Sequence, residues 1–337
     1  MEEWEGKLPP HLLEEFILET VRRPDPRVLV GPSIGEDAAI IDFGEKVLVV
    51  HSDPITGAVE NIGWYAVHIA CNDVATRGAR PRWLLPVMLI PKGGIELARK
   101  IAVDMRKAAE EVDATIVGGH TEFTLGLNRP IISMTAIGEA DKDKYVCTSK
   151  CKPGDLVILT KGVAIEGTAI IASELENVLE KRIPREIIER AKGFLRKISV
   201  VKDALTAMTV GGVHAMHDPT EGGIAGGLQE LALASGLGII AYEKDMLIAE
   251  ETERILSAVK ADPLRTISSG SLLIVAEPSY AFRIIEELKR NGIPAGIIGR
   301  MLPSPEERLI IRKSGAKMDL SEHIEDDLWR VLREVLE

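Results

Sequence analysis

The chain has 337 residues, a formal net charge of -11 and three cysteines, and 45% of its residues are hydrophobic. This length predicts two domains, or one large one, with a sizeable core. An acidic total without a long Lys/Arg block argues against nucleic-acid binding, and sparse cysteines argue against a disulfide framework. The sequence shows neither a signal-peptide pattern nor an apolar stretch long enough to cross a bilayer, which predicts a soluble, cytoplasmic protein.

The first half begins with an amphipathic helix over residues 10–23, which Pro24 and Pro26 end. A mostly apolar helix is predicted over residues 62–76, with Asn61 as its cap. The other elements expected here are strands at 38–42, 47–51, 83–90, 115–117 and 131–137, and a helix at 95–112.

The second half shows the same alternation of helices and strands. Helices are predicted at 166–180, 184–198, 200–208, 221–234, 280–291 and from Ser321 to the end. Strands are predicted at 156–160, near Val213, and at 238–242, 272–276 and 295–299. Mixed elements in both halves predict an α/β (α+β) fold. We expect an arm at residues 1–30, a first domain at 31–148 and a second at 149–337.

Five acidic residues stand at the ends of predicted elements or inside an apolar helix: Asp37, Asp53, Asp73, Glu122 and Asp218. Mg²⁺ prefers oxygen ligands and usually bridges carboxylates to phosphate oxygens. Asp73 is the most informative of them, because its helix carries few other charges and a buried acid needs a partner. The pattern therefore indicates a magnesium site.

A purely structural interpretation of these acids remains open. Asp37 and Asp53 fit ordinary turns, and Asp218 fits a helix cap before Pro219. Spacing alone does not show that distant acids meet, so metal binding is one of two interpretations at this point.

Two glycine pairs, Gly118-Gly119 and Gly222-Gly223, stand near predicted element junctions, where backbone amides approach phosphate closely. Thr121 and Thr220 would add hydroxyl donors beside them. Neither pair fits the P-loop or dinucleotide spacing. Lys161 follows a predicted strand and is either a phosphate-neutralising or a solvated lysine. His120 is a candidate base, phosphate donor or structural group, and no Cys/His spacing indicates zinc.

Six motifs occur in one order along the chain: Gly31–Ala39, Ser52–Pro54, Asn72–Pro81, Gly118–Glu122, Asp218–Gly223 and Ser268–Gly270. Together they resemble the AIR synthase-related superfamily, and look most like its HypE-like branch. The resemblance implies a two-domain AIR synthase-like fold, an N-terminal sheet that pairs across a homodimer, and ATP with Mg²⁺ as cofactors.

The resemblance also implies roles for single residues. It matches Asp37, Asp53, Asp73 and Asp218 to metal or triphosphate positions, and Glu122 as a weaker match. It assigns Asn72, Gly119, His120 and Thr121 to a loop on the phosphate side. HypE proteins carry a C-terminal cysteine that receives a carbamoyl group, whereas the last cysteine here is Cys151. We therefore expect HypE-like ATP machinery with an altered acceptor.

The leading hypothesis is an ATP- and Mg²⁺-dependent enzyme that phosphorylates a carbonyl or amide oxygen of a small substrate. It is linked by resemblance to hydrogenase or other metalloenzyme maturation, with a maturation factor as a further partner. The candidate catalytic residues are His120, Asp73 and Lys161. One alternative is a kinase similar to thiamine-monophosphate kinase, and another is a non-catalytic ATP-binding maturation partner.

Overall fold

The computed structural model describes residues 8–56 and 59–336, and the chain packs into two compact units. The N-terminal unit comprises Pro24–Gly31 and Asp37–Tyr145. The C-terminal unit comprises the chain up to Arg23, the segment Pro32–Glu36, and everything from Val146 onward. The helix predicted at the start of the chain is therefore part of the C-terminal unit. The last crossing between units follows Tyr145, a few residues before the predicted boundary between residues 148 and 149.

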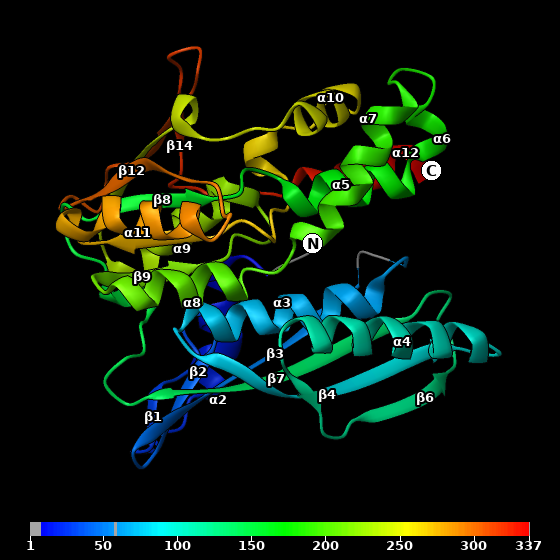
Figure 1. The fold of residues 1–337 in the computed structure, drawn as a ribbon, viewed down its shortest axis with the longest axis horizontal. Coiled ribbons are helices and arrows are strands. Elements are labelled where there is room, and N and C mark those ends of the chain that lie inside the picture. The colour runs from blue at the N-terminus through cyan, green and yellow to red at the C-terminus, as the bar shows by residue number, and fades with distance from the viewer. Residues whose placement is uncertain (1–7, 57–58, 337) are drawn as a thin grey trace. The chain divides into compact units, whose positions relative to one another are not determined.

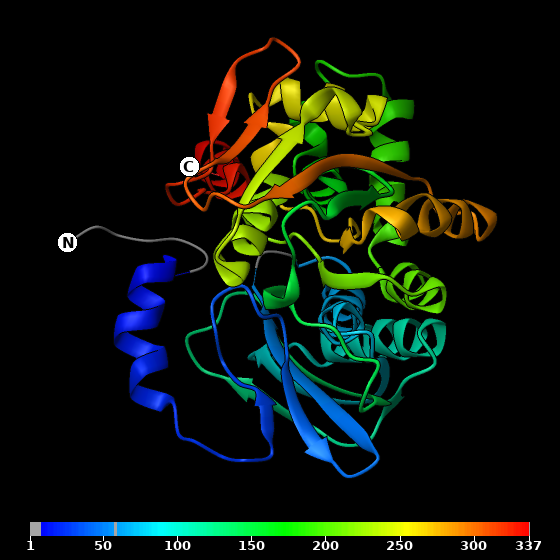
Figure 2. The ribbon, with the colours of Figure 1, turned by 90° about the vertical axis from the view of Figure 1, so that its left-hand side faces the viewer.

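The N-terminal unit contains a seven-stranded mixed sheet with the order β1-β2-β3-β7-β4-β5, and β6 also pairs with β4. Two helices, α3 (Ile62–Thr76) and α4 (Ile95–Glu111), lie on one face of this sheet (Figure 1). The strands are β1 (Val28–Val30), β2 (Ala39–Phe43), β3 (Lys46–Ile55), β4 (Arg80–Pro91), β5 (Thr115–Ile116), β6 (His120–Thr124) and β7 (Ile131–Asp141). Strands β2 and β3 form an antiparallel hairpin (Figure 2).

Alternation along β3 decides which side chains face the helices. Val47 and Val49 are fully buried, and β3 packs against α3. Side chains alternate between faces with a period of two, so His51 and Asp53 lie on this same inner face. We call the opposite side the outer face; among the described residues no helix of this unit covers it.

The C-terminal unit contains a second seven-stranded sheet, with the order β14-β13-β10-β12-β8-β11-β9. Its strands are β8 (Leu156–Thr160), β9 (Val213–His217), β10 (Gly238–Tyr242), β11 (Leu273–Ala276), β12 (Ala295–Leu302), β13 (Arg308–Ile311) and β14 (Lys317–Asp319). Every residue of β11 is buried, as expected for a strand covered on both faces.

Helices of the C-terminal unit form two groups. Apart from the last helix, α12 (Asp327–Leu336), one group packs near the sheet: α8 (Val201–Val210), α9 (Gly223–Ser235) and α11 (Pro278–Arg290). The other forms a helical cluster: α5 (Ile165–Glu174), α6 (Glu176–Leu179), α7 (Arg185–Lys192) and α10 (Glu250–Ala258). Short helical turns complete the unit: α1 (Pro10–Leu12), η1 (Leu13–Leu18), α2 (Glu19–Val21), η2 (Thr148–Lys150), η3 (Gly193–Lys197), η4 (Glu243–Asp245) and η5 (Pro263–Arg265).

Most predicted elements are present, and their differences have local causes. The helix predicted over 166–180 divides at Leu175, whose backbone leaves the helical region. The last helix begins at Asp327 instead of Ser321, because the Asp326 carboxylate accepts a hydrogen bond from the Leu328 amide and fixes the start there. Asn61 occupies the predicted cap position of α3 in a left-handed conformation, but its side chain makes no capping bond.

No helix among residues 8–56 and 59–336 has both the length and the apolar composition needed to cross a membrane.

Candidate functional site

Two carboxylates approach each other in the N-terminal unit. Asp37 stands just before β2, and Asp73 lies in the last turns of α3. A carboxylate oxygen of Asp37 lies within 4.8 Å of one from Asp73, and Asp73 is 7% exposed. Two unit charges at about this separation repel by roughly 3–4 kcal/mol at an effective dielectric constant near 20. The pair therefore requires positive charge close by.

Two neighbours at the end of α3 contact Asp37. The Arg77 guanidinium, which is fully buried, donates through Nη2 to Asp37 Oδ2 at 2.8 Å. The Thr76 hydroxyl lies 3.0 Å from the same oxygen and 2.7 Å from the Asp73 carbonyl oxygen. Arg77 also contacts the Thr76 hydroxyl through Nε at 3.3 Å. These contacts orient Asp37 through one of its two oxygens.

Strand β3 brings one further predicted residue, Asp53, and a histidine, His51, to the same side of the sheet as α3. His51 Nε2 lies 3.3 Å from Asp73 Oδ2. Asp53 is two residues further along the inner face. Asn72, beside Asp73 in α3, is fully buried. Burial raises the pKa of the Cys71 thiol, and Asp73 adds to this effect, so Cys71 stays protonated and is not a nucleophile.

The Gly118–Glu122 motif lies at the edge of the sheet and forms the turn into β6. The β4 register pairs His120 with Val87, which places His120 and Glu122 on the outer face, away from α3. His120 Nε2 contacts Glu122 at 3.2 Å, and the Thr124 hydroxyl donates to Glu122 at 2.8 Å. The hydrogen bond from His120 is the main cause that lowers the pKa of Glu122. The structure thus does not bring Glu122 to the Asp37–Asp73 pair.

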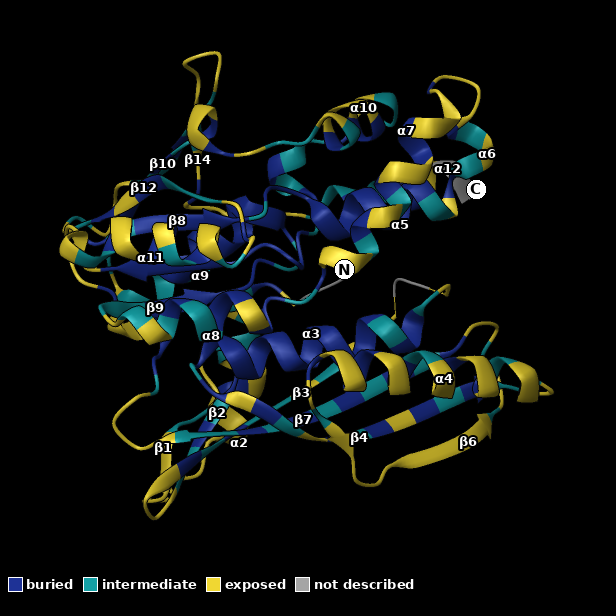
Figure 3. Ribbon diagram, in the orientation of Figure 1, coloured by how far each residue is buried: buried dark blue, intermediate teal, exposed yellow. Residues whose placement is uncertain are grey.

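Gly119 has a structural reason to be glycine. Its φ is 140°, and a Cβ there would lie 2.2 Å from the Pro86 carbonyl oxygen. Gly118 is less constrained, since a Cβ there would meet only the Leu85 side chain at 3.7 Å. Thr121 is exposed in β6, which is exposed along nearly its whole length (Figure 3). Strand packing therefore explains Gly119 without a phosphate, and it leaves Gly118 unexplained.

The second carboxylate motif is in the C-terminal unit. Asp218, 1% exposed, follows β9 and precedes the turn into α9. The Gly222 amide donates to Asp326 Oδ2 at 2.7 Å, and the Gly223 amide donates to the Thr220 carbonyl at 3.0 Å. The two backbone amides that were predicted to bind phosphate are thus already hydrogen-bonded within this unit.

Lys161 is held inside the C-terminal unit. Its Nζ donates to the Ser199 carbonyl at 2.5 Å and lies 3.1 Å from Asp203 Oδ1. The Thr160 hydroxyl donates to Asp203 at 2.8 Å. Burial lowers the pKa of Lys161, and Asp203 opposes that effect. Of the two interpretations of Lys161, the solvated lysine is therefore wrong, because the ammonium is buried and pairs with Asp203; its catalytic role stays a prediction.

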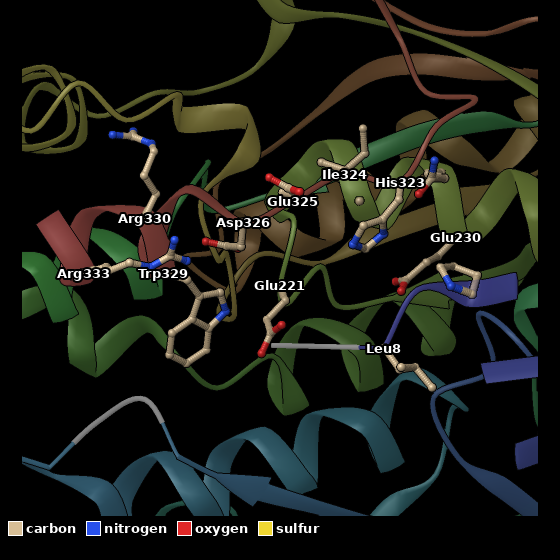
Figure 4. A pocket seen from close by; sticks show the side chains of 13 residues that line it. Leu8, Glu221, Glu230, His323, Ile324, Glu325, Asp326, Trp329, Arg330 and Arg333 are labelled. Carbon is tan, nitrogen blue, oxygen red and sulfur yellow. The ribbon is translucent and has the colours of Figure 1, made fainter. Parts of the chain in front are cut away.

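A cavity of about 330 Å³ adjoins the Asp218–Gly223 loop within the C-terminal unit. Side chains of α9 and of the segment 323–333 line it, and Figure 4 shows Trp329, Glu221 and Asp326 around its interior. The lining also includes Gln229, Glu230, His323, Glu325, Arg330 and Arg333. The Trp329 indole nitrogen is buried and has no hydrogen-bond acceptor among the described residues. The cavity is within the size range of small-molecule sites.

Sequence reasoning missed two residues that contact the predicted motifs, Arg77 and Asp326. Arg77 had a detectable signal, because it is a lone cation at the end of an apolar helix, one turn after Asp73. Asp326 had none, because its partner Gly222 is 104 residues away.

The fold and the paired carboxylates define a two-unit α/β protein with a candidate cation site. Residues 35–140 match the family model described as AIR synthase related protein, N-terminal domain, and residues 152–312 match its C-terminal domain. The chain therefore belongs to the AIR synthase-related family, a superfamily of ATP-dependent enzymes.

Three curated relatives cover most of the chain. A putative hydrogenase expression/formation protein of Methanocaldococcus jannaschii is 29% identical over 87% of this chain and 88% of its own. Carbamoyl dehydratase HypE of Rhodobacter capsulatus is 25% identical, with coverage of 88% and 86%. Selenide, water dikinase of Caldanaerobacter subterraneus is 27% identical, with coverage of 91% and 95%.

Solved structures agree with this assignment. A HypE–HypF complex contains a chain with a TM-score of 0.77 and 26% identity, covering 93% of this chain and 99% of that one. HypE in complex with ATP gives a TM-score of 0.69 at 22% identity, with coverage of 93% and 95%, and so supports the fold alone. The expected family and two-domain fold are confirmed.

Proposed function

We propose that this protein uses ATP and Mg²⁺ to activate a carbonyl or amide oxygen of a small substrate by phosphorylation. The observation that carries the proposal is the close approach of Asp37 and Asp73 in the N-terminal unit. It is supported by family membership and by the relatives named carbamoyl dehydratase and selenide, water dikinase.

The residues around this pair fit Mg²⁺. Carboxylate oxygens are its preferred protein ligands, and Mg²⁺ is typically held by one or two carboxylates together with substrate phosphates. Asp37 and Asp73 would supply the carboxylates, and Asp53 faces the same side from β3. Bound Mg²⁺ would neutralise charge on the transferring phosphoryl group. His51, close to Asp73, would hold that carboxylate in position.

The cavity beside the Asp218–Gly223 loop is the candidate substrate pocket. Its volume and mixed polar lining suit a small polar molecule.

We also propose two kinds of partner. The first is a second copy of this chain, on the apolar outer face of the N-terminal sheet. The second is a maturation-factor protein; the support is the similarity to HypE, whose solved complex contains HypF. By the same similarity, the pathway is maturation of a hydrogenase or another metalloenzyme.

ATP turnover in the presence of Mg²⁺ tests the enzyme proposal. Asp73→Asn and Asp218→Asn should each lower turnover by about 10- to 100-fold, the range typical of losing a side chain that holds a metal ion or its ligands in place. Asp113→Asn, at a largely exposed side chain, is the matched control and should retain turnover. Thiamine monophosphate in the substrate panel distinguishes a kinase, since its diphosphate would then accumulate. Unchanged turnover in both site variants would remove the mechanism.

A further inference from the structure

The end of α3 carries a cation that the proposed metal chemistry does not use. Arg77 is the largest of the fully buried side chains, and it is followed directly by Gly78 with a φ of 75°. A buried guanidinium is stable only when it is paired and hydrogen-bonded. Its partners include Asp37 Oδ2 at 2.8 Å and the Thr76 hydroxyl at 3.3 Å.

We propose that Arg77 is a built-in counter-cation of the Asp37–Asp73 pair, which stabilises the metal-free site and weakens its affinity for Mg²⁺. This inference rests on the proposed function, because it concerns the same carboxylates. Arg77 touches Asp37 and acts through it, so it is a positioning residue.

The direction of the effect follows from charge. The guanidinium neutralises part of the charge on Asp37 when no metal is bound, so the two carboxylates remain close together. The same positive charge opposes an arriving dication. Removing the charge should therefore strengthen Mg²⁺ binding, provided that Asp37 keeps its orientation. The Thr76 hydroxyl would keep Asp37 in this orientation, because it lies 3.0 Å from the same Asp37 oxygen.

Substitution of Arg77 by methionine removes the positive charge but keeps a long side chain in its place, since methionine is flexible and apolar. Arg77→Met should lower the melting temperature of the metal-free protein, because Asp37 and Asp73 then lack their counter-charge. Adding MgCl₂ should raise the melting temperature of this variant more than that of the wild type. The MgCl₂ concentration that gives half of this rise, the midpoint, should fall on the order of tenfold, as for directly coupled groups. Arg77→Lys keeps the charge and should restore the wild-type midpoint in part.

Arg82→Met is the matched control in the same unit. Arg82 is 39% exposed and pairs with Glu139 and Asp113 instead of Asp37. It should leave the MgCl₂ midpoint unchanged. In metal-free buffer, the double variant Asp37→Asn/Arg77→Met should lose less stability than the summed losses of the two single variants. The reason is that each single substitution leaves one buried charge without its opposite charge, whereas the double variant removes both charges.

The outcomes separate this inference from the proposed function. If the wild-type protein shows no response to MgCl₂, with or without ATP, the proposed metal site fails and this inference fails with it. If the wild type responds but Arg77→Met has the same or a higher midpoint, only the role of Arg77 is overturned. Additive losses in the double variant would likewise show that Arg77 and Asp37 are not coupled.

Discussion

Lys161 shows how one residue changes its interpretation when its neighbours are known. In the sequence it follows a strand, as a phosphate-binding lysine would. In the structure its backbone has a φ of 58°, and its ammonium is held by Asp203 and the Ser199 carbonyl. A lysine in this arrangement stabilises the fold, and its catalytic role stays a prediction that requires it to leave Asp203.

Lys161→Met should lower the free energy of unfolding by about 3 kcal/mol, because Asp203 would remain buried without its cation. The Thr160 hydroxyl would still contact Asp203, which limits the loss. Urea denaturation measures the change. Lys202→Met, at an exposed lysine of α8, is the control and should stay within about 0.5 kcal/mol of the wild type. Equal effects of the two substitutions would show that the buried pair does not stabilise the protein.

Single residues were predictable where burial and charge conflict. Asp73 was identified as an acid inside an apolar helix, and the structure gives it a nearby carboxylate and a histidine. Glu122 was grouped with it because it follows a predicted strand, and the family resemblance assigned His120 to the phosphate side. Their strand, β6, was not predicted, so the face on which they lie could not be known. Side-chain direction depends on strand register, which a motif does not contain.

At the scale of elements, the segment before α12 is tied to the start of α9. Gln229 of α9 donates to the Leu320 carbonyl at 2.7 Å, and the Gly222 amide donates to Asp326. The Asp262 amide donates to Asp327 at 2.6 Å. These bonds hold residues 320–326 in a non-helical path, where the sequence predicted a helix from Ser321 onward.

Asp326 should make stability depend on pH. Burial is the main cause that raises the pKa of this carboxyl from 3.8 to about 7, so the fold favours its protonated form. The stability that the protonated Asp326 carboxyl contributes is fully present below about pH 4, and it is lost as the pH rises to about 7. Asp326→Asn should therefore gain stability relative to the wild type between about pH 5 and pH 8.

Melting temperatures at these two pH values check the prediction, with Asp319→Asn as the control. Asp319 is exposed, and the hydrogen bond from Ser321 lowers its pKa. Its charge therefore does not change between about pH 5 and pH 8, and the control should run parallel to the wild type. If the difference in melting temperature between Asp326→Asn and the wild type were the same at both pH values, the raised pKa of Asp326 would be contradicted.

The elements themselves were largely predictable, because helix and strand periods differ. The predicted bounds of α3 agree with the structure, and β8 and β10 also fall where expected. Strands β1, β6, β13 and β14 were missed. They are short and depend on pairing with distant strands, such as β4 with β6 and β10 with β13. Non-local pairing leaves little trace in a short sequence window.

At the scale of the whole molecule, the outer face of the N-terminal sheet is rich in apolar residues. Val50 pairs with Ile137, and Ile137 pairs with Trp83, which gives a continuous apolar row across β3, β7 and β4. Trp83 is 39% exposed and Val87 is 38% exposed. An apolar sheet face of this kind is typical of a protein interface, which supports the proposed homodimer.

Trp83→Glu should dissociate the proposed dimer, because it places a charge at an exposed position of the apolar row. Light scattering after size-exclusion chromatography should give about twice 36.7 kDa for the wild type and about 36.7 kDa for the variant. Phe282→Glu, at a 68% exposed residue of α11, is the control and should stay dimeric. A wild-type mass of one chain would remove the dimer proposal.

The path of the chain between its two units has a consequence for dissecting the protein. The segment Pro32–Glu36 belongs with the C-terminal unit although it lies between β1 and β2 of the N-terminal sheet. There the Glu36 carboxylate accepts hydrogen bonds from the amides of Thr148 and Ser149 at 3.1 and 3.0 Å. A fragment cut out as residues 146–337 would therefore lose a piece of its own architecture, and only a permuted chain that carries residues 32–36 along would preserve it.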